Sequence, residues 1–587
     1  MGAEEVPSAF FSSDVVDNAE LSDTALVAAI RKALASAQCE DTDHYNQLVQ
    51  LMYIKKESAD DDVDVVAQRE TLLKILSRSV ACLDEVHHKR LLQLIFGTRI
   101  WDHIPNVNVM YALLDLIVSL ATTSGKYLIY CLDMLVSNLR SHPHKLNSSK
   151  MLEVLSRVHA ALDKISCLVP IAPSKLLPIL ALRMPSLYEK DHLQVVAPYV
   201  ENLLKLENSS IGKVIGNGIL RMVMERLRDL DLEIGWDDIL QDDSSIAMFD
   251  MELDVEGTMN EGEEFPVRSL NKNGNVVSEL FDDLMVLSFK HLESCQDAGR
   301  LDEVFENLFE SFENLILNTQ KLKVSQFLMF YACSLDTENC GVKFASKLLD
   351  IYLSSKNPQV TRTNAVAYLA SYLARAEFLP ASFVASMLKR LVGECADYCR
   401  QCNHDASPEA HQVFYSGCQA ILHVFCFRMS SILNVPHFQS QLIPLESVLS
   451  HKLDPLRVCL PSVVSQFLYQ AKASGLFIVL DAFILDELSK SELSRALGGF
   501  FPFDRCLLKN SNRYISRVKR TYDEDDDQEF SPEVTVYGDT DCEDNVVLDN
   551  EVNKMSITPK HSFMHETERL LKMPSKIRPS TCPRESL

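Results

Sequence analysis

Apolar side chains recur along the chain at the i, i+3, i+4 and i+7 spacing of amphipathic helices, from about Ser22 onward. The clearest stripe consists of Leu301, Val304, Phe305, Leu308, Phe312, Leu315 and Ile316. A second helix is expected between Pro358 and Pro380, because proline suits a first turn and also marks the end of a helix. The face predicted for this helix consists of Val360, Ala365, Val366, Leu369, Ala370 and Leu373.

The same period predicts further helices on both sides of these two. In the first half they are expected at 71–83, 109–121, 126–139, 150–167, 175–182, 195–206 and 213–230. In the second half they are expected at 324–333, 342–352, 381–392, 413–432, 460–469 and 476–488. Strand-like alternation is nearly absent, and 18 glycines are few for a chain with many strand turns. The pattern indicates an all-α protein.

The helices fall in pairs at a period of roughly 40 residues, as in HEAT and armadillo repeats. With 587 residues the chain is too long for a single core, since cores stop growing beyond about 250–300 residues. The sequence between Pro358 and Leu373 also resembles the inner helix of a HEAT repeat, in which small alanines allow a second helix to approach closely. We therefore predict an α-solenoid, a HEAT-repeat superhelix.

One polar stretch interrupts the helical pattern, and a second follows its end. Residues 237–264 contain eleven acidic residues and no Lys or Arg, so we predict a disordered acidic loop over 237–275. This loop is either a solvated linker or a contact for a basic partner. The predicted organisation is a flexible lead-in at 1–20, helical halves at 21–236 and 276–515, and a disordered basic and acidic tail at 516–587.

Charge and composition narrow the class of protein. The net charge of −25 argues against binding of duplex DNA by the chain as a whole, because phosphate contacts need Lys and Arg. Sixteen cysteines are scattered, several on apolar helix faces, which is typical of reduced thiols in the cytosol or nucleus. The acidic start is unlike a secretory signal, and Asp115 and Asp481 break the longest apolar runs, so no membrane span is expected.

One cluster has metal-ligand residue types. Cys395, Cys399, Cys402 and His404 form a Cys-x3-Cys-x2-Cys-x-His run, a weak zinc candidate because Cys and His lie only two residues apart. The alternative is a set of free thiols. Phosphate-binding loops, nucleophile elbows and His-Glu-x-x-His motifs are absent, so neither catalysis nor a cofactor is expected.

The end of the helical region carries candidate regulatory residues. Five basic residues within twelve could form a nuclear localisation signal or a partner contact: Lys509, Arg513, Arg517, Lys519 and Arg520. Phosphorylation candidates are Ser148, Ser149, Ser209, Ser210, Thr521, Ser531 and Thr558. Thr521 is followed by acidic residues, Ser531 and Thr558 by proline, and the four remaining serines lie between predicted helices of the first half.

Several blocks of sequence resemble the RNA polymerase I-specific transcription initiation factor family. The most specific begins Phe501-Pro502-Phe503-Asp504 and continues through Leu507-Leu508-Lys509 to Arg513-Tyr514-Ile515. Similar blocks begin at Tyr368, Phe414 and Leu453, whereas Lys190-Asp191-His192 has Asp where some relatives have Ser. The resemblance covers roughly residues 72–515.

The resemblance implies a nuclear and nucleolar factor that binds the stalk side of RNA polymerase I and connects it to promoter-bound core factor under control by phosphorylation. Partner contacts are expected at Arg362, Arg375, Phe501, Phe503, Asp504 and Lys509. Arg362 and Arg375 have an alternative role, the stabilisation of neighbouring repeats. Neither a small-molecule substrate nor direct DNA binding is expected, and a homodimer of the free protein stays open. The alternatives are a HEAT-type scaffold or nuclear transport adaptor, and a zinc enzyme built on the cysteine cluster.

Overall fold

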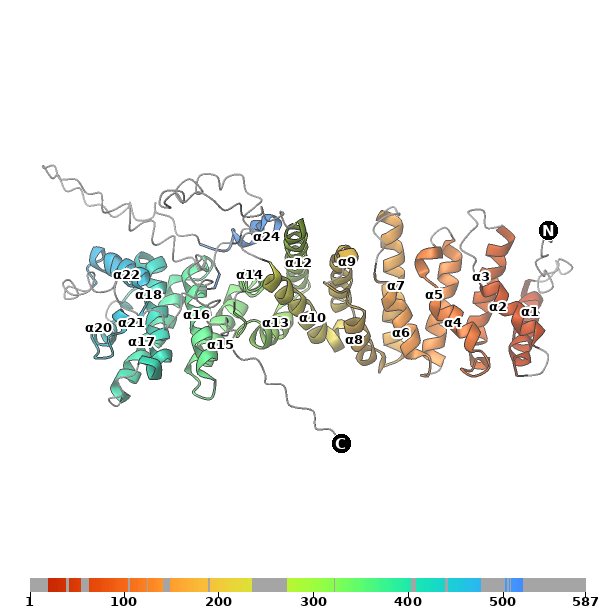
Figure 1. Cartoon of the computed structure of the whole chain (residues 1–587), viewed down its shortest axis with the longest axis horizontal. Coiled ribbons are helices and arrows are strands. Elements are labelled where there is room, and N and C mark those ends of the chain that lie inside the picture. The colour runs from red at the N-terminus through yellow and green to blue at the C-terminus, as the bar shows by residue number, and fades with distance from the viewer. Residues whose placement is uncertain are drawn as a thin grey trace, which may run out of the picture. The chain divides into compact units, whose positions relative to one another are not determined.

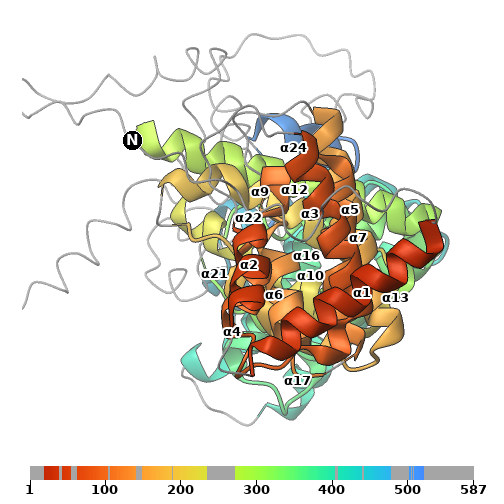
Figure 2. The ribbon, with the colours of Figure 1, turned by 90° about the vertical axis from the view of Figure 1, so that its right-hand side faces the viewer.

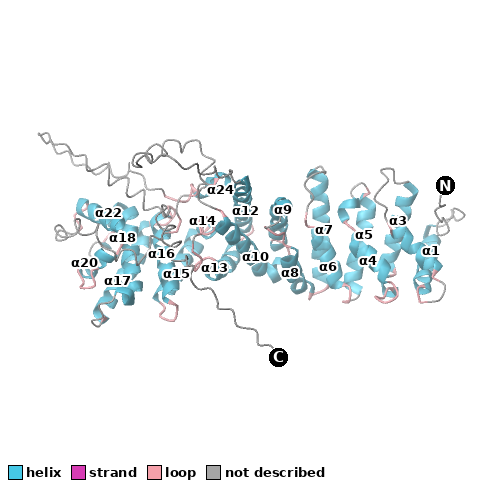
Figure 3. Cartoon of the chain, viewed as in Figure 1, coloured by secondary structure: helices cyan, strands magenta, loops and turns pink. Residues whose placement is uncertain are grey.

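The computed structural model describes residues 19–38, 42–53, 63–103, 106–123, 125–140, 148–187, 190–234, 272–320, 322–402, 408–438, 442–476, 502–503, 506 and 508–520. Within these ranges the chain forms α-helices with short 3₁₀ and π turns, and no strand (Figure 3). An isolated antiparallel bridge joins Ala376 to Lys519. The prediction of an all-α chain is confirmed. Most of the predicted lead-in, acidic loop and tail lies outside the described residues. The predicted ends at 20 and 275 are wrong, because α1 already begins at Ala19 and α12 at Lys272.

The chain divides into two compact units, Met1–Ser311 and Phe312–Leu587, and each is described by itself. The sequence placed the division across 237–275, whereas in the structure it falls within α13 (Leu301–Leu315). The reason is packing. Helix α12 (Lys272–Asp297) lies against α9 (Lys190–Glu207) and α10 (Gly212–Glu233), so it completes the first unit although it follows the acidic stretch in sequence.

The first unit begins with eight α-helices and two 3₁₀ turns that precede α9. They are α1 (Ala19–Ser36), α2 (Asp43–Met52), α3 (Val63–Arg78), η1 (Val80–Cys82), α4 (Lys89–Gly97), η2 (Ile100–His103), α5 (Val107–Thr123), α6 (Leu128–Ser137), α7 (Ser148–Leu168) and α8 (Ala172–Arg183). The helices predicted between residues 71 and 230 all correspond to elements of this unit. The one predicted at 71–83 begins eight residues earlier, at Val63, and the other ends differ by one to five residues.

These helices form two layers (Figure 1). Helices α1, α3, α5 and α7 contact one another in turn, and α2, α4, α6, α8 and α10 form the second row. Seen after a quarter turn, the two rows lie on opposite sides of the stack (Figure 2). A helix that packs within its own row and across to the other row needs apolar residues on most of its circumference. This explains why ten residues of α5 are buried.

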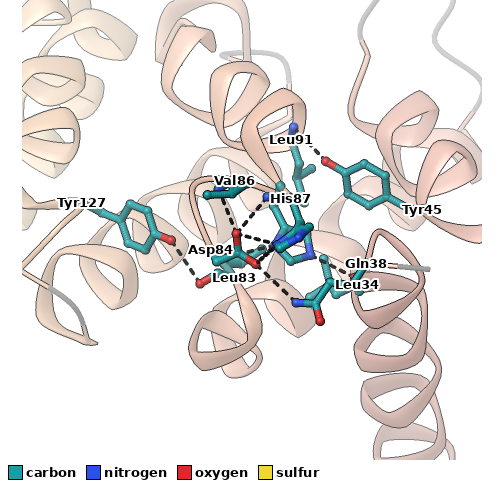
Figure 4. Close-up of polar contacts among 10 residues, drawn as sticks. Leu34, Gln38, Tyr45, Leu83, Asp84, Val86, His87, Leu91 and Tyr127 are labelled. Carbon is teal, nitrogen blue, oxygen red and sulfur yellow. Dashed lines mark hydrogen bonds and ion pairs between the residues drawn. The ribbon is translucent and has the colours of Figure 1, made fainter. Parts of the chain in front are cut away.

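Polar contacts around Asp84 join three successive helix pairs of this stack (Figure 4). The Asp84 carboxylate accepts the backbone N–H groups of Val86 and His87, each at 2.8 Å, and the amide of Gln38 beyond α1 at 3.4 Å. The buried His88 ring lies 2.9 Å from the Leu34 carbonyl oxygen. These contacts satisfy backbone groups that the turns between helices leave open.

The second unit contains the remaining helices. After α13 they are α14 (Phe327–Leu335), a π turn η5 (Thr337–Gly341), α15 (Val342–Leu353), α16 (Gln359–Arg375), α17 (Ala381–Gln401), η6 (Pro408–His411), α18 (Gln412–Leu433), α20 (Ile443–Leu449), α21 (Pro455–Val458), α22 (Pro461–Ala473) and α24 (Lys509–Ile515). Most of the helix predicted at 476–488 lies outside the described residues.

Helix α16 is the centre of this unit, because it packs against both α15 and α18. Five of the six positions predicted for its buried face are fully buried. The sixth prediction is wrong: Val360 is 57% exposed, since it lies in the first turn, ahead of the contact with α18. Pro358 caps the helix rather than occupying its first turn. Tyr368 and Tyr372 are also buried, so the second half of the helix is enclosed all round.

The segment after Pro502 returns to this centre. We call its described residues, 502–503, 506 and 508–520, the C-terminal strap. Phe503 is buried among rings of α14 and α16, and α24 packs on α14. The strap ends as an extended piece beside the C-terminus of α16, where the Arg520 N–H donates to the Arg375 carbonyl oxygen at 2.8 Å. The strap therefore packs against α14 and α16, which are distant from it in sequence.

Candidate functional site

A cavity lies in the first unit where α7 and α9 line the same opening. Its volume is about 500 Å³. The lining residues come from the two helices and the turn after α9: Leu152, Leu155, Ser156, His159, Ala160, Asp163, Lys205, Leu206 and Ser209. We call this opening the α7–α9 groove. It combines apolar side chains with a few polar groups, the usual composition of a surface that receives a ligand or another protein.

Polar contacts span the α7–α9 groove. The His159 ring lies 2.9 Å from the side-chain oxygen of Asn202, which joins α7 to α9 below the surface, and burial lowers the pKa of His159. Ser210 donates its hydroxyl to the Asp163 carboxylate. Ser209 donates to the Leu206 carbonyl oxygen at 2.8 Å and also accepts the N–H of Ile211. The turn after α9 is thus attached to α7 through one serine.

Two predicted phosphorylation residues therefore lie at the α7–α9 groove. Ser210 is exposed and Ser209 half-buried. Ser149 is exposed in the first turn of α7, and Ser148 begins that helix. Thr521, Ser531 and Thr558 lie outside the described residues. The sequence contains no sign of the groove, because the position of α9 against α7 depends on how the helices around them pack.

The partner contacts predicted from the family resemblance belong to the second unit, where two of the four described ones, Phe503 and Arg375, are buried. Phe503 is fully buried, so in this fold its ring contacts α14 and α16 and offers no surface. Arg375 is 6% exposed, and its guanidinium lies 4.7 Å from the centre of the Phe427 ring on α18. Arg362 donates to the Tyr352 carbonyl oxygen at 2.7 Å and so joins α16 to α15. Both arginines have the repeat-stabilising contacts that the sequence left as an alternative.

Lys509 is exposed at the start of α24 and stays a predicted partner contact. Phe501 and Asp504 lie outside the described residues. The basic run divides into two kinds of residue: Lys509, Arg513 and Arg517 are exposed, whereas Lys519 is 6% exposed with its ammonium 5.2 Å from the Phe327 ring centre. Arg520 is half-buried. In the folded strap, therefore, only three of the five basic side chains of the predicted signal are exposed.

The cysteine run does not assemble a metal site within the described residues. Cys395 is buried against Cys418, while Cys399 and Cys402 are half-buried, and His404 lies outside the described ranges. Burial raises the pKa of Cys399 to about 11, so this thiol is neutral near pH 7. In the described part of the chain, three donor atoms converge elsewhere, at Glu207, His291 and Cys295.

None of the described helices is long and apolar enough to cross a membrane. Stacked helix pairs with a groove and buried, structural polar groups define a helical-repeat protein of the kind that binds other macromolecules. Residues 19–526 match the model of the family described as RNA polymerase I specific transcription initiation factor RRN3. The chain belongs to this family, which is one of initiation factors rather than of enzymes, and the resemblance noted in the sequence is confirmed.

Proteins similar to this chain in other organisms carry the same family name. The chain is 25% identical over 588 residues to the RNA polymerase I-specific transcription initiation factor rrn3 of Schizosaccharomyces pombe, with 92% of this chain and 94% of that protein covered. It is 27% identical to the mouse factor RRN3, where the match covers 64% of this chain and only 62% of the mouse protein. A crystal structure of the initiation factor Rrn3 superposes with a TM-score of 0.65 at 19% identity, covering 84% of this chain and 97% of that one. The predicted fold class is thereby confirmed.

Proposed function

We propose that this protein binds RNA polymerase I on its stalk side and bridges it to promoter-bound core factor for transcription of ribosomal RNA genes. The observation that carries the proposal is the family match over residues 19–526. A stack of helix pairs supports it, because such stacks offer extended surfaces to large partners. The same proposal places the protein in the nucleus and the nucleolus, with Lys509, Arg513 and Arg517 as the exposed part of a localisation signal.

The α7–α9 groove is the surface we assign to the polymerase. Leu152 lines it and is 52% exposed, and Leu168 at the end of α7 is 58% exposed. Ile171, which follows α7, and Val214, in the first turn of α10, are also more than half exposed. Exposed apolar side chains beside a groove are the features that a protein partner buries on docking.

Phosphorylation of Ser210 would regulate docking at this surface. The Ser210 hydroxyl donates to the Asp163 carboxylate, and a phosphate would replace that hydrogen bond with repulsion between two negative groups. The turn after α9 would then separate from α7, and negative charge would enter the docking surface. Ser209, which lines the same opening, would act in the same direction.

The test is affinity purification of the tagged chain from nuclear extract, with the recovered subunits identified by mass. We expect polymerase I in preference to polymerases II and III. Ser210→Glu should lower the recovery at least about tenfold, since like charges in an interface cost several kcal/mol and about 1.4 kcal/mol already corresponds to tenfold. Ser210→Ala should bind as the native chain does. Ser149→Glu is the matched control, because Ser149 is also an exposed serine but lies in the first turn of α7 and does not line the groove.

Two results would contradict these proposals separately. Recovery of import or trafficking components without polymerase would favour the transport adaptor over the initiation factor. Normal polymerase recovery by Ser210→Glu would leave the initiation factor in place but remove the α7–α9 groove as its regulated docking surface.

A further inference from the structure

Three side chains of different chemistry meet inside the first unit, at the point where α9 ends and α12 passes it. Glu207 is the last residue of α9 and is 1% exposed. His291 and Cys295 lie one turn apart on the same face of α12, with exposures of 6% and 0%. Their donor atoms, a carboxylate oxygen, an imidazole nitrogen and a sulfur, all lie within 4.8 Å of one another.

We propose that Glu207, His291 and Cys295 bind a zinc ion. Nitrogen and sulfur donors together favour zinc over magnesium or calcium, which prefer oxygen ligands. The His-x3-Cys spacing on α12 brings two ligands to one helix face, and Glu207 supplies a third from a different helix.

The distances suit a tetrahedral ion. The Cys295 sulfur lies 3.5 Å from the His291 Nε2 atom, close to the separation of about 3.6 Å between sulfur and nitrogen ligands on one zinc ion. The Glu207 Oε2 atom lies 2.9 Å from the same nitrogen, against about 3.4 Å on zinc. Binding therefore asks the carboxylate oxygen to move by about half an ångström.

The Glu207 carboxylate has one oxygen engaged and one directed at the cluster. Arg300 donates to Oε1 at 2.6 Å, as an outer partner that orients a metal ligand does. Oε2 is buried and contacts the His291 Nε2 atom at 2.9 Å, so it faces the cluster. An ion bound between these two atoms would replace this contact.

Asn208 supplies the edge of the site. Its side-chain oxygen lies 3.6 Å from the Cys295 sulfur, and its amide donates to Ser294 at 3.4 Å, which fixes the orientation of the group. Asn208 is exposed, so water reaches the cluster from this side. The Asn208 oxygen also accepts from Arg300 at 3.0 Å, so a water molecule would take the fourth position on zinc.

The proton released on zinc binding comes from the Cys295 thiol. The Cys295 sulfur donates its proton to solvent and binds the ion as a thiolate, while His291 binds as the neutral ring and Glu207 as the carboxylate. Each ion bound therefore releases a proton, and affinity rises with pH. The ion would tie the end of α9 to α12, directly before the turn that carries Ser209 and Ser210.

The experiment measures zinc in the untagged full-length chain, purified with a thiol reductant and without chelator, by mass spectrometry of the metal. We expect about one zinc per chain, and a loss of about tenfold or more in zinc affinity for Cys295→Ser. Cys399→Ser is the matched control, because it removes a half-buried cysteine from the other cysteine run and should leave the zinc content unchanged.

A second readout does not depend on a variant that folds. Cobalt added to the metal-free native chain should give the absorption bands of a tetrahedral cobalt thiolate, and zinc should remove them. A native chain that takes up neither zinc nor cobalt in a titration would overturn the proposal. Full zinc content in Cys295→Ser, or its loss in Cys399→Ser, would overturn it as well.

Discussion

The ring of Phe503 in the C-terminal strap lies 4.9 Å from the ring of Phe330 on α14, centre to centre. Phe503 also meets Phe327, Tyr368 and Tyr372, and its backbone has a φ of 67°. A left-handed conformation at a bulky residue costs about 1–3 kcal/mol, and it persists only where burial outweighs it. The strap is therefore part of the core of the second unit.

Phe503→Ala should destabilise the second unit by about 3–5 kcal/mol, because it removes a fully buried aromatic ring and leaves a cavity. Denaturant unfolding followed by circular dichroism would measure the change. Tyr469→Ala is the control, since Tyr469 is an aromatic residue of the same unit that is 58% exposed. Equal stability of the two variants would show that the strap is not packed as described.

Lys519→Ala should release the end of the strap. The Lys519 ammonium lies 5.2 Å from the Phe327 ring centre, and such a contact is worth about 1–2 kcal/mol when desolvated. Proteolytic cleavage after Arg513 should accelerate about tenfold, because cleavage requires local opening. Lys509→Ala removes an exposed lysine from the same strap and should leave the rate unchanged. Equal rates in the two variants would argue against Lys519 as an anchor.

Gly417→Ala should destabilise the second unit by about 1–3 kcal/mol through overpacking. A methyl group at this position on α18 would overlap the hydroxyl oxygen of Tyr352, which is buried. Gly393→Ala on α17 is the control, since nothing lies within 4 Å of a methyl group there. That control should be neutral or slightly stabilising, because alanine is the better helix former. Thermal unfolding of both variants would show whether α15 and α18 approach as closely as the structure has them.

Asp84 should make the stability of the first unit depend on pH, with a loss of stability in acid. The backbone N–H of His87, followed by the other donors, holds the pKa of this carboxyl well below its ordinary value. A lowered pKa in the folded state stabilises the fold above the ordinary pKa of about 3.9, and this contribution is lost as pH falls through the folded value.

The measurement is the difference in unfolding free energy between the native chain and Asp84→Asn. It should be about 1 kcal/mol at pH 7, because the group is partly exposed and solvent screens its charge. It should shrink as the pH falls below about 4. Asp115→Asn is the control at an exposed carboxylate whose nearest lysine nitrogen lies 3.9 Å away. A difference that stays constant down to pH 2 would contradict the role given to Asp84.

The sequence by itself determined the all-α class, the helix pairs and the family. Apolar spacing identifies helices because it follows from the period of a single element, and five of the six face positions predicted for α16 are buried. The blocks around Tyr368 and Phe503 include buried residues at the centre of the second unit, where few replacements fit a closely packed core.

Tertiary structure decided what these residues do. Phe503, predicted to meet a partner, is inside, because the strap returns across about 170 residues of sequence to α14, and no local pattern encodes that contact. The same holds for Glu207, which is far in sequence from His291 and Cys295 but converges with them. The compact run from Cys395 to Cys402 follows one face of α17 and brings no such set of donors together within the described residues. Spacing in sequence fixes neighbours within one helix. The packing of helix against helix fixes which donors, charges and serines share a site.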